Sequence, residues 1–358
     1  MFKTLKEAQV SGKRVILRAD LDVPLKDGQI GEDYRLRALV PTLKYLLNQK
    51  ARVLIIGHAG RPTSAKASAG KPGMHVVPEL SLKPVADYLG DLLGREVEFF
   101  DNYSLLFADR KLQPSVARTA PSINYSLALL ENLRFWPGEE ANDPDFAKKL
   151  ASIGDLYVND AFAASHRAHA SIAGVPELLP AYAGLRLEEE ISHLSGVIED
   201  PERPLVFILG GAKTETKAPL VPAFAAVADA VLLGGRLMFM PELNKIPKVV
   251  FPVDDLDTFD IGEKSIHLFT DSIKNAQTVV WNGPMGRWEE ERYVAGTRAI
   301  AAALAESPAK TIVGGGDTIA ALSAFGLLEK MKYISMGGGA MLEFLAGEKL
   351  PGLVALDY

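Results

Sequence analysis

The chain has 358 residues, of which 48% are hydrophobic and 23% are charged, and its net charge is −6. This composition is typical of a globular protein of two or three domains, without general affinity for nucleic acid or anionic membranes. The absence of cysteine excludes disulfides and thiolate nucleophiles and favours a cytoplasmic location. No apolar stretch is long enough for a membrane span, and the N-terminus lacks the core of a signal peptide. Any anion-binding site must therefore be a local cluster of basic residues.

Short apolar runs alternate along the chain with segments of helical character, which predicts parallel sheets covered by helices on both faces. The first half contains five such runs, at residues 14–20, 52–58, 96–100, 127–132 and 155–160. The second half contains five more, at residues 205–211, 230–235, 278–286, 311–317 and 333–340. One mononucleotide-binding half does not hold ten strands, so we predict an α/β protein with two doubly wound parallel-sheet lobes.

Residues 185–200 carry apolar side chains close to helical spacing, and Pro201 follows directly. We predict a helix there that acts as a hinge between the lobes. The small, basic segment at 65–73 is expected to be a loop. We divide the chain into an N-terminal lobe at 1–172, a hinge helix region at 173–203, a C-terminal lobe at 204–340 and a C-terminal segment at 341–358.

Glycine follows every strand that is predicted in the second half. The glycines occur at 210–211, 234–235, 283 and 286, 314–316 and 337–339. One such pair alone is typical of a tight turn. Five in one sheet predict a polyphosphate or nucleotide site, because glycine lets backbone N–H groups approach an anion closely.

Charged side chains follow the strands of the first half instead. A lone surface arginine is usually a solvated charge, but here several arginines and histidines fall at equivalent positions of one sheet. They are Asp20, Asp22, Arg35, His58, Arg61, Arg134, His166, Arg167 and His169. Because arginine donates in a bidentate manner to carboxylate and phosphate, this pattern predicts a pocket for a small, multiply anionic substrate.

The stretch GGAKTETK at 210–217 is similar to a nucleotide phosphate loop, but Ala212 separates Gly211 from Lys213. Lys213 and Lys217 are four residues apart, so they would share one face of a helix that begins after Gly211, near a bound phosphate. Other chemistries are not indicated, because the chain has no G-x-G-x-x-G, H-E-x-x-H or G-x-S-x-G motif.

The chain resembles the phosphoglycerate kinase family over essentially its whole length. The most specific stretches are YVNDAFAASHRAHAS at 157–171 and VWNGPMG at 280–286, and RADLDVP at 18–24 and IVGGGDT at 312–318 also match. The resemblance implies two α/β lobes, with the C-terminus returning to the N-terminal lobe. It implies a monomeric phosphotransferase that uses Mg²⁺ and transfers a phosphoryl group between 1,3-bisphosphoglycerate and ADP, giving 3-phosphoglycerate and ATP. It implies neither a nucleic-acid nor a membrane partner.

The resemblance also assigns site residues. Phosphoglycerate would bind to Asp20, Asp22, Arg35, His58, Arg61, Arg134 and Arg167. The nucleotide would bind to Gly211, Lys213, Lys217, Asn282, Glu289, Gly314, Gly315, Gly316, Asp317, Thr318, Gly338 and Gly339, with Asp317 as the ligand of Mg²⁺. The catalytic residues would be Arg35, Lys213 and Lys217, which stabilise the charge of the transferring group. The substrates would bind to different lobes, which would close for the reaction.

The sequence departs from the family pattern in several places. Asp22 stands where the family has asparagine. Arg236 and Arg287 stand where the family has small or apolar residues near the adenine. Residues 240–260 keep little of the helix and loop that the family has there. Three hypotheses therefore stay open: an active kinase, a weakly active or non-catalytic homologue that binds phosphoglycerate or nucleotide, and a kinase with relaxed base preference.

Overall fold

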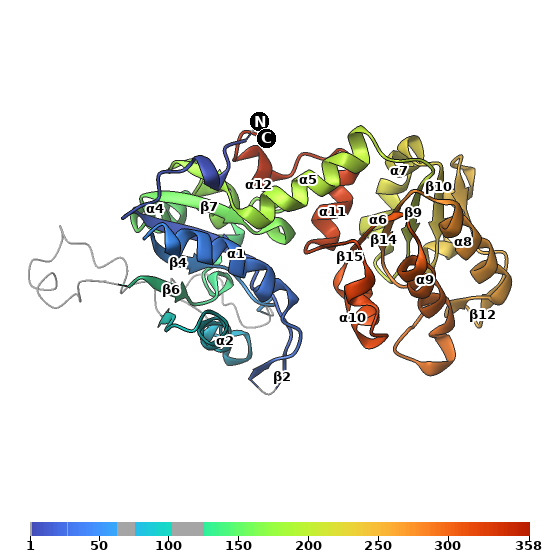
Figure 1. Cartoon of the computed structure of the whole chain (residues 1–358), viewed down its shortest axis with the longest axis horizontal. Helices are drawn as coiled ribbons and strands as arrows, with labels where there is room; N and C mark the ends of the chain where they lie inside the picture. Colours follow the sequence, from blue (N-terminus) through green and yellow to red (C-terminus); the bar gives the residue numbers. More distant parts are fainter. Residues whose placement is uncertain (1, 27, 63–75, 102–124) are drawn as a thin grey trace, which may run out of the picture. The chain divides into compact units, whose positions relative to one another are not determined.

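The computed structural model describes residues 2–26, 28–62, 76–101 and 125–358, so the loop expected at 65–73 lies outside the described residues. The chain divides into two compact units. The first unit comprises Met1–Glu189 and Leu350–Tyr358, and the second comprises Glu190–Lys349. Each unit is built around one six-stranded sheet with helices packed beside it (Figure 1).

The sheet of the first unit has the strand order β5-β6-β4-β1-β7-β8, and all its pairings are parallel. Its strands are β1 (Arg14–Ala19), β4 (Arg52–Ile56), β5 (Glu98–Phe100), β6 (Leu127–Leu130), β7 (Leu156–Asp160) and β8 (Ala181–Ala183), and a small hairpin holds β2 (Leu25–Lys26) and β3 (Gln29–Ile30). Its helices are α1 (Tyr34–Asn48), α2 (Lys83–Leu93), α3 (Pro137–Glu140), α4 (Pro144–Ser152) and α12 (Pro351–Val354). All five strands predicted in the first half are present. Strand β8 was not predicted, because Ala-Tyr-Ala lacks a run of branched apolar residues.

The middle of strand β1, Val15 to Leu17, is apolar because both faces of its sheet are covered. Val15 and Leu17 belong to one core cluster, which includes Leu39 and Leu43 of α1. Ile16 points to the opposite face and belongs to a second cluster, which includes residues of α4. Alternate side chains of a strand point to opposite faces, so a strand that is buried on both sides has no polar alternation.

The sheet of the second unit has the strand order β11-β10-β9-β14-β15-β16, again with only parallel pairs. Its strands are β9 (Leu205–Leu209), β10 (Ala230–Leu233), β11 (Val249–Val250), β14 (Thr278–Asn282), β15 (Lys310–Gly314) and β16 (Tyr333–Ser335). Its helices are α6 (Thr214–Lys217), α7 (Val221–Val227), α8 (Glu263–Asn275), α9 (Ala295–Glu306), α10 (Gly316–Ala324) and α11 (Gly338–Leu345). The five strands predicted in the second half are present, and the prediction of two doubly wound α/β sheets is confirmed.

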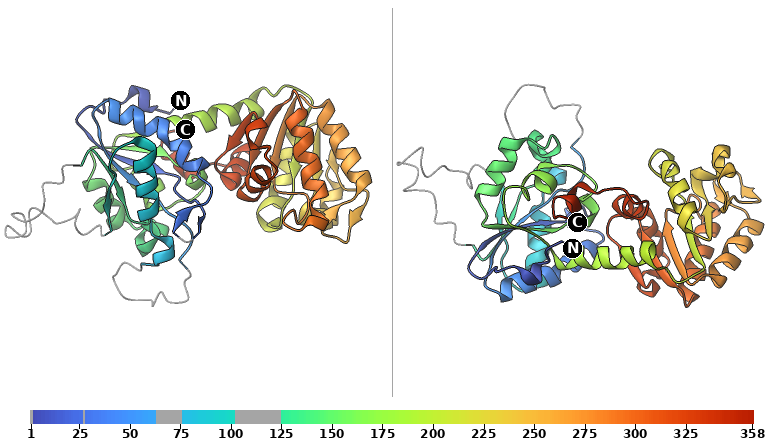
Figure 2. Two further views of the ribbon diagram at one scale, coloured as in Figure 1. Left: turned by 60° about the horizontal axis from the view of Figure 1, so that its bottom comes forward. Right: turned by 90° about the horizontal axis from the view of Figure 1, so that it is seen from above.

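Helix α5 (Leu185–Glu199) is where the sequence predicts a helix, and the division between the two units falls within it. The C-terminus returns to the first unit, as the resemblance implied. There the Gly352 N–H donates to the Ser165 carbonyl over 2.8 Å, and the ring centroids of Phe2 and Tyr358 lie 5.3 Å apart. Figure 2 shows the two chain ends close together. None of the helices in the described ranges is long and apolar enough to cross a membrane.

In each sheet, the later strands are added first on one side of the first strand and then on its other side, which creates a switch point beside that strand. In the first unit this switch point lies between β1 and β7, and in the second unit it lies between β9 and β14. Ligands of open α/β sheets bind beyond the carboxyl ends of the strands at such a point. The topology therefore indicates one candidate site in each unit.

Candidate active site

The switch point of the first unit is held together by Asp20. This residue directly follows β1, and its Oδ2 accepts a hydrogen bond of 2.8 Å from the Ala163 N–H, in the segment after β7. Burial raises the pKa of the Asp20 carboxyl, while the nearby Arg35 guanidinium opposes this shift. Asp20 therefore joins the ends of the two strands that flank the switch point.

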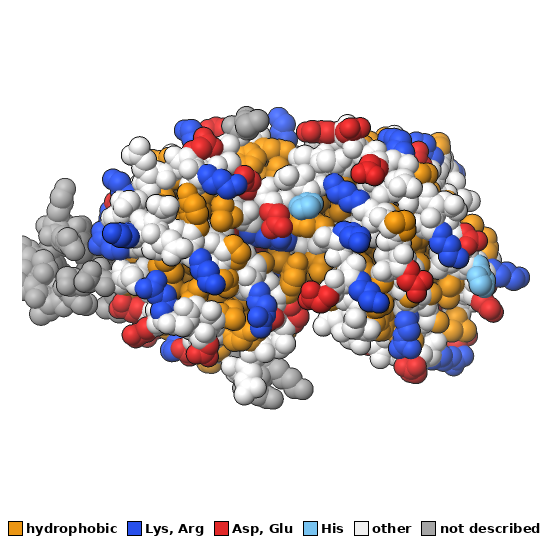
Figure 3. All heavy atoms as spheres, in the orientation of Figure 1, with side chains coloured by type: hydrophobic (Ala, Val, Ile, Leu, Met, Phe, Trp, Pro, Cys, Tyr) orange, Lys and Arg blue, Asp and Glu red, His pale blue; other side chains and the backbone are white. Residues whose placement is uncertain are grey.

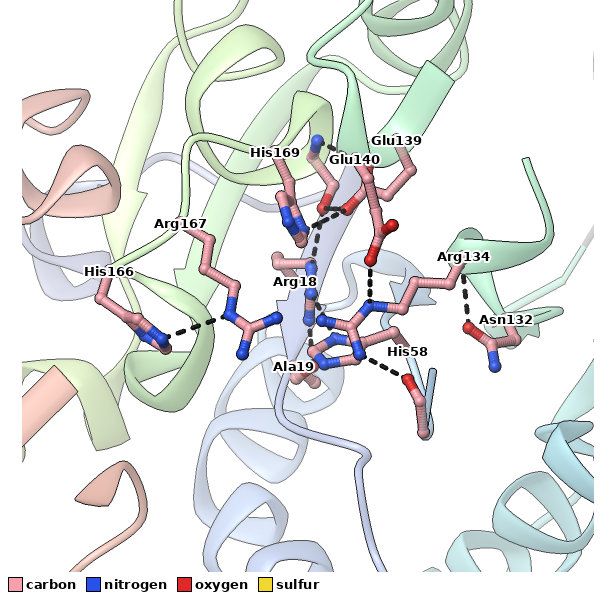
Figure 4. Close-up of polar contacts among 12 residues, drawn as sticks. Arg18, Ala19, His58, Asn132, Arg134, Glu139, Glu140, His166, Arg167 and His169 are labelled. Carbon is pink, nitrogen blue, oxygen red and sulfur yellow. Dashed lines mark hydrogen bonds and ion pairs between the residues drawn. The ribbon is translucent and has the colours of Figure 1, made fainter. Parts of the chain in front are cut away.

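Around this point lies a group of side chains that we call the basic cluster: His58, Arg134, His166, Arg167 and His169 (Figure 4). Arg167 Nε donates to His166 Nε2 over 3.2 Å. Arg134 Nη1 donates to the Gly60 carbonyl, and its Nε lies 3.2 Å from a carboxylate oxygen of Glu140. Burial lowers the pKa of Arg134 to about 10, and the charge of Arg167 adds to this shift. The arginine is still fully charged near neutral pH.

The histidines of the basic cluster are uncharged at neutral pH. Burial, followed by neighbouring arginine charges, lowers the pKa of His166 and that of His169 to about 4. The same causes hold the pKa of His58 well below its ordinary value. The positive charge of this site therefore comes from its arginines alone.

Arg35 and Asp22 lie together at the start of α1. Arg35 Nη1 donates to the Asp22 carbonyl, and Asp22 Oδ1 accepts a hydrogen bond of 2.8 Å from the Gly60 N–H. The Asp22 side chain is exposed, and so is Arg61. The first unit thus brings the predicted phosphoglycerate residues to one edge of the sheet, together with one exposed carboxylate.

Sequence reasoning missed three residues behind this edge: Arg18, Glu139 and Ser171, all of which are fully buried. Arg18 Nη2 lies 2.8 Å from His58 Nδ1, and Arg18 Nε donates to Ser171 Oγ over 2.9 Å. The signal that could have revealed Arg18 is its position inside the apolar run of β1. A charge in a strand that is buried on both faces needs partners.

The concentration of arginines at the basic cluster is local. On the face drawn in Figure 3, basic and acidic side chains are interspersed over each unit and no continuous basic surface forms. This distribution agrees with the net charge of −6 and favours a small anionic ligand.

The switch point of the second unit is organised by Lys217. Its Nζ donates to the Gly210 carbonyl over 2.6 Å and to the Asn282 carbonyl over 3.2 Å. These carbonyls belong to the ends of β9 and β14, which are also joined by a Gly210 N–H to Asn282 carbonyl bond of 3.0 Å. Burial lowers the pKa of Lys217 to about 8, while the Asp317 charge opposes the shift. An ammonium has three donors, so among the residues that the structure describes one N–H of Lys217 is left for a ligand.

The sequence predicted that both Lys213 and Lys217 lie in a helix that begins after Gly211, and this prediction was wrong. Helix α6 begins at Thr214, with the exposed Lys213 as its N-cap, and not directly after Gly211. The reason lies in the backbone of Gly211, which has a φ of +82° and whose N–H donates to the Pro284 carbonyl over 2.7 Å. These constraints keep residues 211–213 out of the helix.

The remaining glycine ends pack closely around Asn282. Its Nδ2 donates to the Gly338 carbonyl over 3.2 Å, and a Cβ on Gly338 would lie 2.5 Å from the Gly315 Cα. Gly315 has a φ of +102°. Thr318 is buried, and its Oγ1 accepts from the Gly283 N–H over 2.8 Å. The close packing explains why glycine is needed at 315 and 338, while Gly314 is buried in β15 and Gly316 and Gly339 are exposed at helix starts.

Asp317 is exposed in the first turn of α10, where its charge acts on Lys217. Among the described residues, no group of three acidic or histidine side chains could hold a metal by itself. Mg²⁺ commonly uses only one or two carboxylates and completes its shell with substrate phosphates and water. A single exposed carboxylate beside glycine-rich strand ends therefore fits a metal that arrives with a nucleotide.

The rim of the second unit carries the two unusual arginines. The Arg287 guanidinium carbon lies 3.7 Å from the centre of the Phe259 ring, and its Nη1 lies 3.4 Å from Glu290 Oε1. Arg236 and Glu289 are exposed. Phe259 belongs to the segment at 240–260, where a short hairpin of β12 (Asp255–Leu256) and β13 (Asp260–Ile261) is present. Arg287 is thus stacked on an aromatic ring.

The fold and the two sites define a two-unit α/β protein with an arginine-based anion site in one unit and a glycine–lysine site in the other. The sequence matches the profile of the phosphoglycerate kinase family over residues 5–244 and 241–348. It is 38% identical to a phosphoglycerate kinase of Rubrobacter xylanophilus over 99% of the chain and 98% of that protein. It is 40% identical to the cytosolic enzyme of Triticum aestivum over the same shares of each.

Solved structures agree with this result. The phosphoglycerate kinase of Coxiella burnetii superposes with a TM-score of 0.80 at 34% identity, covering 100% of this chain and 99% of the other. That of Pyrococcus horikoshii superposes with a TM-score of 0.82 at 30% identity, covering 100% and 98%. The chain belongs to the phosphoglycerate kinase family and is a kinase by that membership. The profile match is divided near residue 241, at the start of the segment that is expected from the sequence to be shortened.

Proposed function

We propose that this chain catalyses Mg²⁺-dependent phosphoryl transfer between 1,3-bisphosphoglycerate and ADP, giving 3-phosphoglycerate and ATP. The observation that carries the proposal is the presence of a cationic site at the switch point of each unit. The arginines of the basic cluster suit phosphate and carboxylate, while Lys217 and the glycine strand ends suit a polyphosphate. Membership in the phosphoglycerate kinase family supports the same reaction. The proposal includes that the protein acts as a monomer in the cytoplasm.

The chemistry needs few groups from the protein. In the direction of ATP use, a carboxylate oxygen of 3-phosphoglycerate bonds to the γ-phosphorus while the bond from that phosphorus to the bridging oxygen of ADP breaks. The nucleophile is already ionised, so no general base is required. Lys213 and Lys217 donate to the phosphates, Arg35 to the transferring group, and the backbone amides of Gly338 and Gly339 to the same charge. Mg²⁺ on Asp317 would neutralise phosphate charge when bound.

A coupled assay tests the proposal directly. Purified protein is given 3-phosphoglycerate, ATP and Mg²⁺, and ADP formation is followed. Turnover that depends on all three supports the proposal. Saturable binding of 3-phosphoglycerate without turnover would instead favour a non-catalytic homologue. The exposed carboxylate of Asp22, which lies beside Arg35, is the observation that motivates this alternative.

We expect Asp22→Asn to tighten the binding of 3-phosphoglycerate. The substitution removes a negative charge from the edge of the anion site, and asparagine Oδ1 can still accept from the Gly60 N–H. Removing one such repulsion is expected to lower the Kd roughly fivefold, equivalent to about 1 kcal/mol. Isothermal titration calorimetry of both proteins measures the change. An unchanged or raised Kd would show that the Asp22 carboxylate does not repel the ligand.

We expect Arg287 to relax the preference for adenine. Its guanidinium, already stacked on Phe259, offers a flat cationic surface that can stack on a base and donate to acceptors such as guanine O6 and N7. GDP should therefore approach ADP in kcat/KM in the wild type, and Arg287→Val should lower the value for GDP more than that for ADP. A strong preference for ADP that the substitution leaves unaltered would contradict this role.

A further inference from the structure

Arg18 lies near the C-terminal end of β1 with its side chain fully buried. All three guanidinium nitrogens are engaged (Figure 4): Nε donates to Ser171 Oγ over 2.9 Å, Nη1 to the Ala19 carbonyl over 2.6 Å, and Nη2 lies 2.8 Å from His58 Nδ1. A buried guanidinium is costly unless its charge is compensated. The negative charge that compensates Arg18 is that of Glu139, which is connected to Arg18 through Ser171.

Glu139 of α3 is a fully buried carboxylate on the other side of Ser171. Its Oε2 accepts from the Ser171 N–H over 2.9 Å, and its Oε1 accepts from the Ser171 hydroxyl over 2.5 Å. A serine hydroxyl has one hydrogen, which this bond uses, so an oxygen lone pair is left to accept from Arg18 Nε. Burial raises the pKa of Glu139, and the charge of Arg18 is the largest effect that opposes this shift. Arginine can only donate, so Arg18 donates to Ser171 Oγ, and with Glu139 ionised the Ser171 hydroxyl donates to Glu139.

This arrangement determines which nitrogen of His58 carries the proton. Arginine has no acceptor, so His58 Nδ1 must accept from Arg18, and the ring hydrogen must be on Nε2. Burial and the charges of Arg18, Arg134 and Arg167, with His169 beside them, keep the ring neutral. His58 Nε2 makes no hydrogen bond within the described residues.

We propose that Glu139, Ser171 and Arg18 form a buried relay that holds His58 as the Nε2–H tautomer, with this hydrogen presented to an anionic ligand of the basic cluster. The three relay residues are positioning residues, because they act through His58. The inference rests on the proposed function only for the identity of the ligand, a phosphorylated carboxylic acid. The tautomer itself is a property of the ligand-free chain.

Nitrogen NMR of the full chain, labelled with ¹⁵N-histidine and free of ligand at pH 7.5, tests the relay. The wild type is expected to show His58 with a protonated Nε2 and an unprotonated Nδ1. Arg18→Met removes the donor to Nδ1 and one repelling charge. It should therefore give mixed tautomers and move the titration of His58 to higher pH. Ser171→Ala should change the tautomer ratio in the same direction and weaken binding of 3-phosphoglycerate about tenfold.

Tyr157→Phe is the matched control. The Tyr157 hydroxyl donates to the Ser171 backbone carbonyl over 2.7 Å, so its loss removes a buried hydrogen bond of a relay residue but none of the hydrogen bonds that link Glu139, Ser171, Arg18 and His58. We expect the wild-type tautomer and an affinity within about twofold. A wild-type His58 protonated on Nδ1 or charged at pH 7.5 would overturn the proposal. So would an unchanged tautomer in both relay variants, or equal losses of affinity in Ser171→Ala and Tyr157→Phe.

The two proposals fail in different ways. A chain with the expected tautomer pattern but no turnover refutes the proposed reaction and leaves the relay in place. An active chain whose His58 tautomer differs from the expectation refutes the relay alone.

Discussion

Lys217→Ala is expected to lower kcat by at least about 10²-fold while the KM values for both substrates change much less. Losing one preorganised donor to the charge of a transition state typically has an effect of this size, about 2.7 kcal/mol or more. Two of the three ammonium hydrogens bind the carbonyls of Gly210 and Asn282, which fixes the direction of the third. Steady-state kinetics with ATP and 3-phosphoglycerate measures the change. A raised KM at unchanged kcat would mean that Lys217 binds only ground-state phosphate.

A matched control separates this effect from a loss of folding. Lys248 is an exposed lysine of the second unit, and its Nζ donates to the Ala228 carbonyl in a part-buried hydrogen bond of 2.7 Å. Lys248→Ala removes a lysine-to-carbonyl bond of the same kind away from the glycine strand ends. We expect its kcat to stay within about twofold of the wild type. Comparable losses of kcat in the two variants would assign the effect of Lys217→Ala to structure.

The pH profile provides an independent measurement of the same residue. The pKa of Lys217 is lowered to about 8 by burial. The ammonium is therefore present below this pH and is lost above it. Because kcat/KM reports the free enzyme, it should fall as the pH rises through about 8. A profile that stays level to pH 9.5 would show that the charge of Lys217 is not required.

The sequence predicted the sheets because each strand is encoded locally. A run such as RVILRAD at 14–20 can be recognised without knowledge of its neighbours, since both faces of the resulting strand are buried. Strand β11, only two residues long, contains no such run and was not predicted. The residues that follow the strands could also be compared from the sequence alone, because the carboxyl ends of parallel strands meet at one edge of the sheet. This comparison predicted one anion site in each half of the chain.

The contacts within the sites could not be predicted in the same way. Arg18 meets His58 and Ser171, which are 40 and 153 positions away along the chain. The partner of Lys217 at Asn282 lies 65 positions away. Such pairings depend on how side chains orient after the sheets have formed, and a sequence motif contains no information about that orientation. The start of α6 at Thr214 likewise follows from the bond of Gly211 to Pro284, which sequence spacing does not reveal.

A different kind of long-range contact leads to a prediction about stability. Asp160, at the end of β7, is buried, and its Oδ1 accepts hydrogen bonds from the N–H groups of Arg186 and Leu187, over 2.9 and 3.0 Å. These groups belong to the first turn of α5, whose free N–H groups need acceptors. Adding a Cβ to Gly184 would place it 2.2 Å from the same oxygen, so the site has no spare room. Asp160 is thus the cap of α5.

Burial raises the pKa of Asp160 from its ordinary value of 3.8 to about 6, against the opposing effect of its hydrogen bonds. A raised pKa means that the folded state favours the protonated carboxyl. The contribution of this group to stability is therefore greatest below about pH 4 and is lost as the pH rises towards 6. A shift of about two pH units corresponds to roughly 3 kcal/mol of unfolding free energy at neutral pH.

Asp160→Asn should remove this pH dependence, because the asparagine Oδ1 can cap α5 in the same way but does not ionise. The unfolding free energy of the variant minus that of the wild type should rise by on the order of 2–3 kcal/mol between pH 4 and pH 7. Urea unfolding at several pH values measures it, and the ¹³C shift of the Asp160 carboxyl gives the midpoint directly. Asp155→Asn is the control of opposite sign, since the Arg14 guanidinium lowers the pKa of Asp155. A difference for Asp160→Asn that stays constant from pH 4 to pH 7 would mean that burial does not perturb this carboxyl.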